Sequence, residues 1–389
     1  MSAAQGPAAA ALAAPAAPGA QQVRAWRVDC SGPGDLDGVR ALIASGELVP
    51  AEIVAVMGKT EGNGCVNDYT RELASQAWCL LLAAHLGCTP AQVHERVALV
   101  MSGGTEGVLS PHFTVFTRRQ VDTALARPGK RLVLGIAHTR DFLPQELGRH
   151  AQIAATADAV RAAMADAGID DPADVHFVQV KCPLLTSAKI AAAMAAGMPP
   201  VSRDTYESMG WSRGASALGV ALALGEVAPA ALDEHAVLSD WSLHSARASA
   251  SAGIELDGNV VIVFGEAAGS ASALRIAHTV MRDAIDGAAV RRLLREQFSL
   301  DPDTDATAIA ARLVNLLAKA EASPDGAVRG ARHTMLNDSD INATRHARAA
   351  VGGVLASIAG HTALYVSGGA EHQGPAGGGP VCAIVRMDT

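Results

Sequence analysis

The chain has 389 residues, of which 49% are hydrophobic and only 3% aromatic, so small and aliphatic side chains must fill a core large enough for two or three domains. A net charge of −8 without basic runs argues against nucleic acid or an anionic membrane as a partner. No stretch of 18 apolar residues suggests a membrane span. The six cysteines form no C-x-x-C pair, which is typical of reduced thiols in a cytoplasmic protein.

The first 22 residues form an Ala/Pro/Gly tract without a charged side chain. A signal peptide would need a basic start and an unbroken apolar stretch, whereas Pro7, Pro15 and Pro18 interrupt this one. We therefore interpret residues 1–22 as a disordered leader outside the fold.

Alternating strands and helices are predicted over the rest of the chain, in three successive domains: 23–126, 127–266 and 267–389. Short apolar runs predict strands, and longer Ala/Leu-rich segments that end at glycine predict helices. In the first domain we expect strands at 23–30, 53–57 and 97–101 and helices at 36–45 and 71–86. In the second we expect strands at 131–137, 176–180 and 259–264 and helices at 151–167 and 213–225.

The third domain is expected to begin with a helix at 278–285. An apolar segment at 309–317 then leads into Lys319, and a helix carrying Arg345 and Arg348 ends at Gly360.

One motif occurs once in each predicted domain: Ser, a small residue, Gly, any residue, Glu. The copies start at Ser102, Ser251 and Ser367, too far apart for a short-period repeat protein. We therefore expect three related domains, each presenting one hydroxyl on a glycine-rich turn.

A lysine and an arginine precede each serine in the same order. The lysines follow apolar segments, and they are Lys59, Lys181 and Lys319. The arginines are expected near the starts of helices, and they are Arg71, Arg213 and Arg348. Arg345, one turn before Arg348, competes for the third position. Arg348 is favoured because it precedes Gly360 by the same spacing that separates Arg213 from Gly225.

Three such sets around a pseudo-threefold axis would suit a ligand with three equivalent polar edges. Arginine suits carbonyl or anionic acceptors, and serine can either donate to a carbonyl oxygen or attack its carbon. Lysine can act as the base for that attack when burial or neighbouring cations lower its pKa. Each feature alone is usually a plain turn or a surface charge, but three ordered copies favour a functional site. The residues alone do not choose among the three Ser–Lys pairs.

Other sites are weaker candidates. Cys182 could be a nucleophile, but a lone cysteine beside proline is more often structural. The histidines lack metal-ligand spacing, and the glycines around Asn63 lack the third glycine of a dinucleotide-binding fingerprint. The carbonyl-rich tail 370–380 could hold a hard cation together with Glu321, although such a loop is usually only a loop.

Several longer stretches resemble the ring-opening amidohydrolase family of cyanuric acid hydrolases and barbiturases. The resemblance extends over residues 23–386 and is carried by 58–71, 102–107, 180–183, 210–214 and 332–380. It implies an α/β (α+β) fold of three structurally related domains around a pseudo-threefold axis, with a central β-barrel-like core and outer helices.

The resemblance also implies an activity, the hydrolytic opening of cyanuric acid to carboxybiuret, which decarboxylates to biuret in s-triazine degradation. Ser251 matches the family's nucleophile and Lys181 its base, with Lys59 and Lys319 as supporting lysines. Ala252 departs from the glycine of the other two motifs, which fits a distinct role for the second turn. The implied substrate-binding positions are Arg71, Ser102, Gly103, Arg213, Ser251, Ala252, Arg348, Ser367 and Gly368.

The same resemblance implies a structural divalent cation, Mg or Ca, no organic cofactor, and a cytoplasmic homotetramer without nucleic-acid or membrane partners. The matching cation positions are Glu321, Ala370, Gln373, Gly374, Pro375 and Gly378. Barbituric acid as the substrate, or a non-catalytic protein that binds a cyclic ureide, remain the alternatives.

Overall fold

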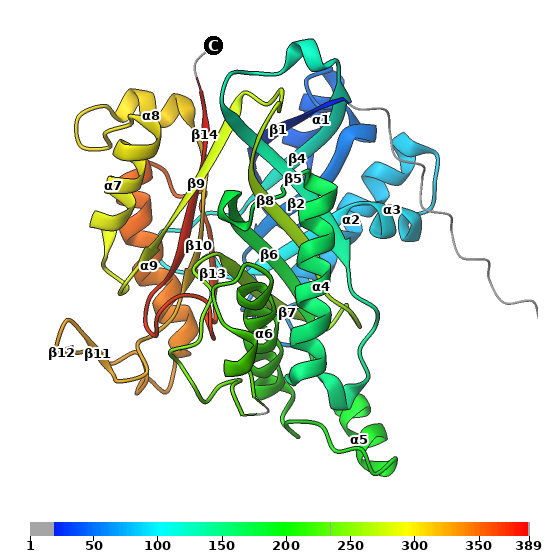
Figure 1. Cartoon of the computed structure of the whole chain (residues 1–389), viewed down its shortest axis with the longest axis vertical. Coiled ribbons are helices and arrows are strands. Elements are labelled where there is room, and N and C mark those ends of the chain that lie inside the picture. Colours follow the sequence, from blue (N-terminus) through cyan, green and yellow to red (C-terminus); the bar gives the residue numbers. More distant parts are fainter. Residues whose placement is uncertain (1–18, 234, 388–389) are drawn as a thin grey trace, which may run out of the picture.

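Three units, each with four main strands and three α-helices, make up the described part of this computed structural model, residues 19–233 and 235–387 (Figure 1). The first unit comprises β1 (Ala20–Asp29), α1 (Asp37–Ala44), β2 (Ile53–Thr60), α2 (Tyr69–Leu86), α3 (Pro90–Arg96), β3 (Ala98–Gly103) and β4 (His112–Val121). The second comprises β5 (Lys130–His138), α4 (His150–Ala167), β6 (Val175–Pro183), α5 (Ser187–Ala195), α6 (Thr205–Ala223), β7 (Ala248–Gly253) and β8 (Val260–Ala268).

The third unit differs in having two helices between its first and second main strands and one between its second and third, and it adds a small hairpin. It comprises β9 (Leu274–Met281), α7 (Gly287–Phe298), α8 (Ala306–Arg312), β10 (Leu313–Ala320), the hairpin β11 (Ala327–Val328) and β12 (Ala331–Arg332), α9 (Ala343–Ala359), β13 (Tyr365–Gly368) and β14 (Gly379–Arg386). Short 3-10 helices lie at Pro50–Glu52, Thr123–Leu125, Pro144–Glu146, Pro172–Asp174 and Pro229–Ala231.

Each unit forms one four-stranded sheet, and all three sheets have the same strand order. The first strand of the unit lies at one edge, followed by the fourth, the second and the third. The second and third strands pair in parallel, and the other neighbours are antiparallel. The orders are β1-β4-β2-β3, β5-β8-β6-β7 and β9-β14-β10-β13.

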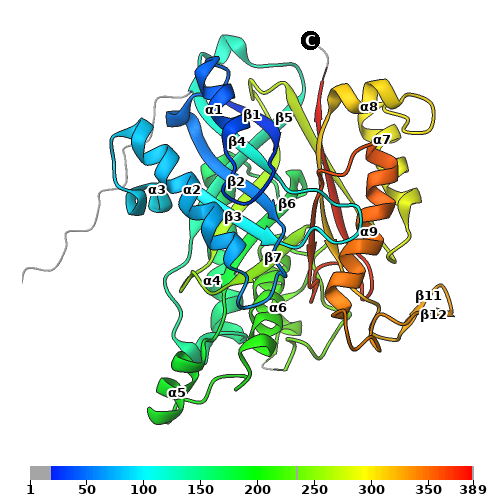
Figure 2. The same cartoon turned by 180° about the vertical axis from the view of Figure 1, so that it is seen from behind.

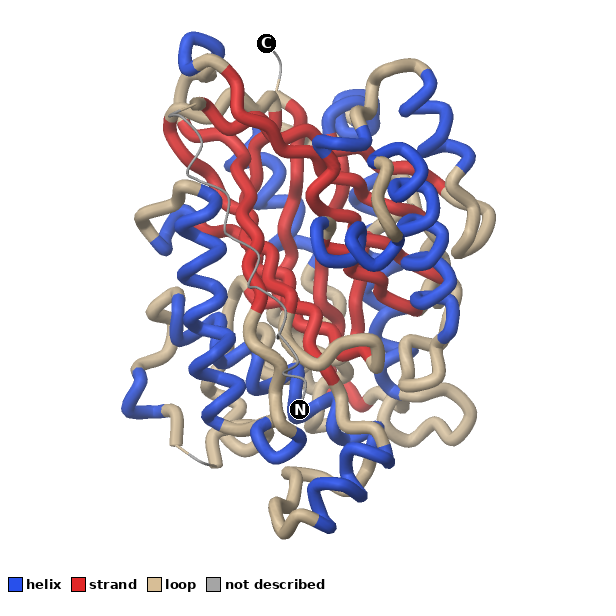
Figure 3. The backbone as a smooth tube through the Cα atoms, turned by 90° about the vertical axis from the view of Figure 1, so that its right-hand side faces the viewer, coloured by secondary structure: helices blue, strands red, loops and turns tan. Residues whose placement is uncertain are grey.

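The inner faces of the three sheets share one central hydrophobic core. Apolar residues from all three units meet there, and the rings of Phe116 and Phe264 lie 5.0 Å apart between centroids. The outer face of each sheet packs on its own helices, as expected for layered domains. Figure 1 shows α4 and α6 over the second sheet, and Figure 2 shows α2 and α3 beside the first and α7 and α9 beside the third. In Figure 3 the strands fill the centre of the molecule.

This arrangement confirms the expected fold class, three related α/β units around a pseudo-threefold axis with helices outside. No helix within residues 19–233 or 235–387 combines the length and hydropathy needed to cross a bilayer.

The expected leader was too long at its C-terminal end. Residues 1–18 lie outside the described part of the chain, but β1 begins at Ala20 and pairs with β4 from there on. Ala20 is buried, and the side chain of Gln21 accepts a hydrogen bond from Leu134 N. Residues 20–22 therefore belong to the fold, although their composition suggested that they were part of the leader. At the second boundary, β8 extends to Ala268, beyond the expected end at residue 266.

Two further expectations about elements were wrong. The predicted helix 278–285 begins inside strand β9, which pairs antiparallel with β14 along its whole length. A short apolar run does not distinguish a strand from a helix, and here sheet pairing decided. The predicted start of a helix at Arg213 was also wrong, because α6 begins at Thr205, where Asp204 caps it. Arg213 therefore lies in the middle of the helix.

Candidate active site

In each sheet the predicted lysine and serine stand directly opposite each other. They are register partners near the ends of the two parallel strands, so their side chains project from neighbouring points at the same edge of the sheet. The pairs are Lys59 and Ser102 on β2 and β3, Lys181 and Ser251 on β6 and β7, and Lys319 and Ser367 on β10 and β13.

A single cavity brings the three units together at these strand ends. The cavity is small. All nine predicted substrate-binding residues line it, and so do Gly64, Met101 and Met209. The structure therefore gathers three serines and three arginines from distant parts of the sequence around one space.

In the first and third units, the lysine donates a hydrogen bond to its serine. Lys59 Nζ lies 3.3 Å from Ser102 Oγ, and Lys319 Nζ lies 3.3 Å from Ser367 Oγ. Each ammonium also donates to the carbonyl of the next glycine in the motif. The two hydroxyl oxygens are 3.4 Å apart. Both serine oxygens thus accept a hydrogen bond from a lysine. A ligand that separates the two hydroxyl groups could therefore accept a hydrogen bond from each of them.

Burial is the main influence on these two lysines. Both are fully buried, and burial together with the charge of Arg348 lowers the pKa of Lys59 well below its usual value. Burial and the charge of Arg213 lower the pKa of Lys319 to about 7. Desolvation and like charges both disfavour the ammonium form.

The second unit departs from this pattern at its lysine. Lys181 Nζ lies 3.1 Å from a carboxylate oxygen of Glu255 and donates to Met101 O at 3.0 Å. Among the described residues, no hydrogen bond joins it to Ser251. Burial lowers the pKa of Lys181, and Glu255 opposes that effect. Burial disfavours the charged form of Glu255, but the charges of Lys181 and Arg71 outweigh it and lower its pKa to about 2.

The glutamates that end the repeated motifs connect the units through arginines. Glu106 of the first unit holds Arg348 of the third in a two-pronged ion pair at 2.5 and 2.7 Å. Glu371 of the third unit holds Arg213 of the second in the same way, at 2.5 and 2.8 Å. Such paired contacts fix the plane of the guanidinium group at the cavity wall. In the second unit, the equivalent glutamate is Glu255, which forms its ion pair with Lys181 instead of an arginine.

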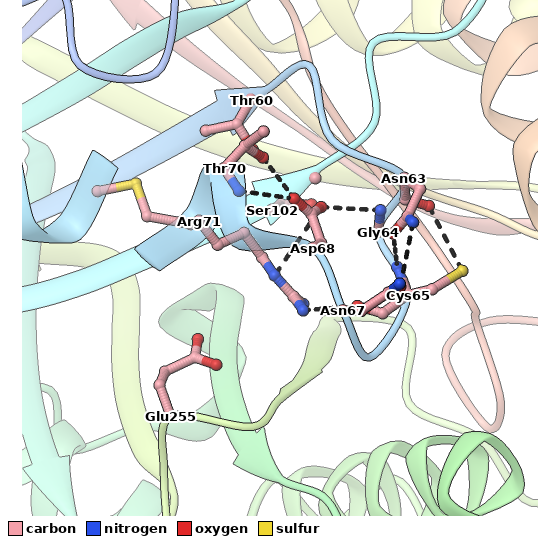
Figure 4. A network of polar contacts seen from close by, with 12 residues as sticks. Thr60, Asn63, Gly64, Cys65, Asn67, Asp68, Thr70, Arg71, Ser102 and Glu255 are labelled. Carbon is pink, nitrogen blue, oxygen red and sulfur yellow. Dashed lines mark hydrogen bonds and ion pairs between the residues drawn. The ribbon is translucent and has the colours of Figure 1, made fainter. Parts of the chain in front are cut away.

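The third arginine is held mainly by backbone carbonyls. Arg71 donates to Ala252 O at 3.1 Å and to Cys65 O at 2.7 Å. The loop before it is folded around Asp68, which accepts from the backbone of Gly64 and Thr70. Figure 4 shows this network, with the carboxylate of Glu255 facing Arg71.

The structure places the competing candidates away from the cavity. Arg345 Nη2 lies 3.8 Å from the sulfur of Cys65. Of Arg345 and Arg348, only Arg348 lines the cavity. Cys182 is fully buried, and burial raises the pKa of its thiol, so it is neither exposed to a ligand nor readily ionised.

The predicted cation positions lie together behind the third motif. Glu321 is partly buried and accepts a hydrogen bond from Ala370 N at 2.5 Å. Burial and the nearby charge of Glu371 raise the pKa of Glu321 to about 7. Gln373 accepts from Ala250 N at 2.7 Å, next to Ser251. No cluster of three His, Cys, Asp or Glu side chains exists in the described residues, so a cation here would need backbone or amide oxygens.

Sequence reasoning missed several residues around the cavity. The repeated motif included the glutamates Glu106, Glu255 and Glu371, but no role was predicted for them. Their occurrence in all three copies could have indicated one. Sequence reasoning also missed Gln179, which donates from Nε2 to Ser251 Oγ at 3.2 Å. Aligning the three units would have revealed Gln179 as a polar residue at a position that is apolar in the other two.

The fold and the cavity define a protein with three related units whose hydroxyl and guanidinium groups surround one small cavity with approximate threefold symmetry. The sequence profile described as "Amidohydrolase ring-opening protein (Amido_AtzD_TrzD)" matches residues 24–386. The chain belongs to this family and is a hydrolase.

Individual relatives agree with this assignment. The cyanuric acid amidohydrolase of Pseudomonas sp. (strain ADP) is 62% identical over 361 residues, which cover 93% of this chain and 98% of the relative. That of Bradyrhizobium diazoefficiens is 60% identical, with 94% and 98% covered. A solved cyanuric acid hydrolase superimposes with a TM-score of 0.91 at 61% identity, covering 94% of this chain and all of the other. The enzyme from A. caulinodans gives a TM-score of 0.85 at 49% identity, with 95% and 100% covered.

Proposed function

We propose that this chain hydrolyses cyanuric acid to carboxybiuret, which loses carbon dioxide to give biuret. The observation that carries the proposal is the threefold set of Lys–Ser register pairs and arginines around one small cavity. Cyanuric acid is a flat ring with three carbonyl groups in threefold symmetry, which matches this set. Full-length relatives that carry the name of this activity support the same substrate.

Binding would use the donors of the cavity. The three arginines present fixed N–H groups toward ring carbonyls, and Ser102 and Ser367 donate to the two carbonyls that are not attacked. Their lysines strengthen this donation, because a hydroxyl oxygen that accepts a hydrogen bond becomes a better donor through its own hydrogen. These contacts withdraw electrons from the ring and make the remaining carbonyl carbon more electrophilic.

Ser251 is the proposed nucleophile, with Lys181 as its base. Ser251 Oγ forms a bond to a ring carbonyl carbon while its proton passes to neutral Lys181 Nζ. The ring C–N bond then breaks, and the nitrogen takes the proton from Lys181. Attack of one water molecule on the resulting ester releases carboxybiuret and restores the serine. Lys181 must turn from Glu255 to Ser251, and catalytic hydrogen bonds often form only when substrate is bound.

A divalent cation behind the third motif is a second part of the proposal. Glu321 fits it, because a cation would offset the repulsion between Glu321 and the nearby carboxylate of Glu371 and so lower the pKa of Glu321. The carbonyl oxygens of Ala370, Gly374, Pro375 and Gly378 and the amide of Gln373 would supply further oxygen ligands. Its role would be structural, holding the loop whose Gln373 binds the nucleophile's strand. Cytoplasmic localisation and a homotetrameric state also stay predictions. Size-exclusion chromatography with light scattering tests the oligomeric state.

Product analysis tests the proposed function. The purified protein should convert cyanuric acid to biuret and carbon dioxide in equal amounts, and barbituric acid in a parallel assay should react much more slowly. Binding of cyanuric acid without formation of biuret would refute the hydrolytic function. Faster turnover of barbituric acid would assign the other substrate of the family.

A further inference from the structure

The three sheets differ most one layer below their serines. Two residues before each Lys–Ser pair, the same two strands carry another register pair. In the first unit this pair is Met57 and Val100, and in the third it is Leu317 and Tyr365. In the second unit it is Gln179 and Ser249, both fully buried. A polar pair thus stands only beneath Ser251, at positions where its counterparts have apolar or aromatic side chains.

The contacts of Gln179 fix the orientation of its amide. Nε2 donates to Val180 O at 3.2 Å and to Ser251 Oγ at 3.2 Å, and Oε1 accepts from Ser249 Oγ at 2.8 Å. A backbone carbonyl can only accept, so the amide nitrogen must lie on the side of Val180. Ser251 Oγ therefore accepts from Gln179, and its own hydrogen is directed elsewhere.

This contact replaces the one that the other serines receive from their lysines. Ser102 and Ser367 accept from Lys59 and Lys319, so each of these lysines acts toward its serine as a donor. Because Gln179 supplies the donor for Ser251, Lys181 does not have to donate to it, and a neutral Lys181 that turns from Glu255 can accept its proton. A buried amide also costs stability unless its polar atoms are all paired, and Met57, Val100 and Leu317 show that apolar side chains can occupy this layer. The polar pair therefore points to a role in the reaction.

We propose that Gln179, held by Ser249, is a positioning residue that orients Ser251 Oγ for attack and donates to it as negative charge develops there. The proposal rests on the proposed function, with Ser251 as the nucleophile. Gln179 is fully buried and is not among the residues that line the cavity. In this role it acts through Ser251 and does not contact the substrate.

The test replaces Gln179 by the residue of the first unit, Gln179→Met, which keeps the length of the side chain and removes all three of its hydrogen bonds. We expect kcat for biuret formation to fall about 10- to 100-fold, with KM for cyanuric acid changed less than about twofold, because only the developing charge loses a donor. Met57→Leu and Leu317→Met alter the same layer in the other units and should leave kcat within about twofold. Wild-type kcat in Gln179→Met would overturn the proposal while leaving the hydrolytic function of the wild type untouched.

Two further measurements separate positioning from a general loss of packing. In a Ser251→Ala background, Gln179→Met should leave the Kd for cyanuric acid unchanged in calorimetry, because the residue through which it acts is gone. A large change in Kd would show that Gln179 shapes the cavity and would contradict the proposal. If Gln179→Met does not fold, Ser249→Ala decides, since it frees the amide but leaves Gln179 in place. A smaller fall in kcat at constant KM is then expected, and no fall would overturn the proposal.

Discussion

Ser251 and its counterparts Ser102 and Ser367 stand at equivalent positions in three similar sheets, but their neighbours differ. Ser102 and Ser367 accept from buried lysines, whereas Ser251 accepts from Gln179. Glu106 and Glu371 hold arginines of other units, whereas Glu255 pairs with Lys181. The shared features suit the binding of a threefold ligand, and the differences single out one serine. The comparison teaches that groups repeated in all three units can bind a threefold ligand, whereas the contacts found in only one unit can determine which serine reacts.

The largest expected effect comes from removing each serine in turn. Ser251→Ala should lower kcat by more than about 10⁴-fold, because no other group can take its place as nucleophile. Ser102→Ala and Ser367→Ala should each lower kcat about 10²- to 10³-fold, the usual loss of one donor to a developing negative charge. Steady-state rates of biuret formation measure all three, with thermal unfolding as the control for folding. Equal losses at the three serines would remove the distinction between them.

A second prediction concerns the pH dependence of the proposed base. Lys181 must be neutral to accept a proton, so kcat/KM should rise with pH through its pKa. Glu255 raises that pKa, so Glu255→Gln should lower it and move the rising limb of the profile to lower pH.

The matched control for this prediction is Glu106→Gln, whose glutamate pairs with Arg348 instead of a lysine. It should raise KM because it frees the guanidinium group, and it should leave the rising limb in place. A limb that does not move in Glu255→Gln would mean that Lys181 does not control the rate.

The smallest expected effect is on stability and comes from Lys319, which lacks the close carboxylate partner of Lys181. Its folded pKa is about 7 and its unfolded pKa is about 10.4, so between these values the unfolded chain binds more protons. Lys319 therefore makes the free energy of unfolding rise with pH above 7. Lys319→Met should flatten this slope by up to about 1.4 kcal/mol per pH unit, measured by denaturant titration from pH 7 to 9.5. An unchanged slope would show that Lys319 keeps its ordinary pKa in the folded protein.

The sequence predicted the fold and the wall of the cavity because both are repeated. The order of Lys, Arg and Ser in three copies indicated three related units, and the register of the parallel strands brings each Lys–Ser pair together. It failed where tertiary pairing overrides local pattern. Strand β9 was mistaken for a helix because its partner β14 lies about a hundred residues later in the chain.

The exceptions to the symmetry were not predictable from one unit alone. Glu255 is identical in the motif to Glu106 and Glu371, and only the fold shows that it pairs with a lysine. Gln179 lies in an apolar strand, where a single polar residue gives no sign of its partner. Its contact with Ser251 depends on the parallel register of β6 and β7, which is a property of the folded sheet.

The most direct test of the account is to locate the covalent intermediate. Rapid quenching of the enzyme during turnover of isotopically labelled cyanuric acid, followed by peptide mapping with mass spectrometry, identifies the serine that carries the opened ring. The account predicts an increase equal to one substrate molecule on the peptide that contains Ser251, and none on those with Ser102 or Ser367. A labelled ring on either of the other two serines would contradict it.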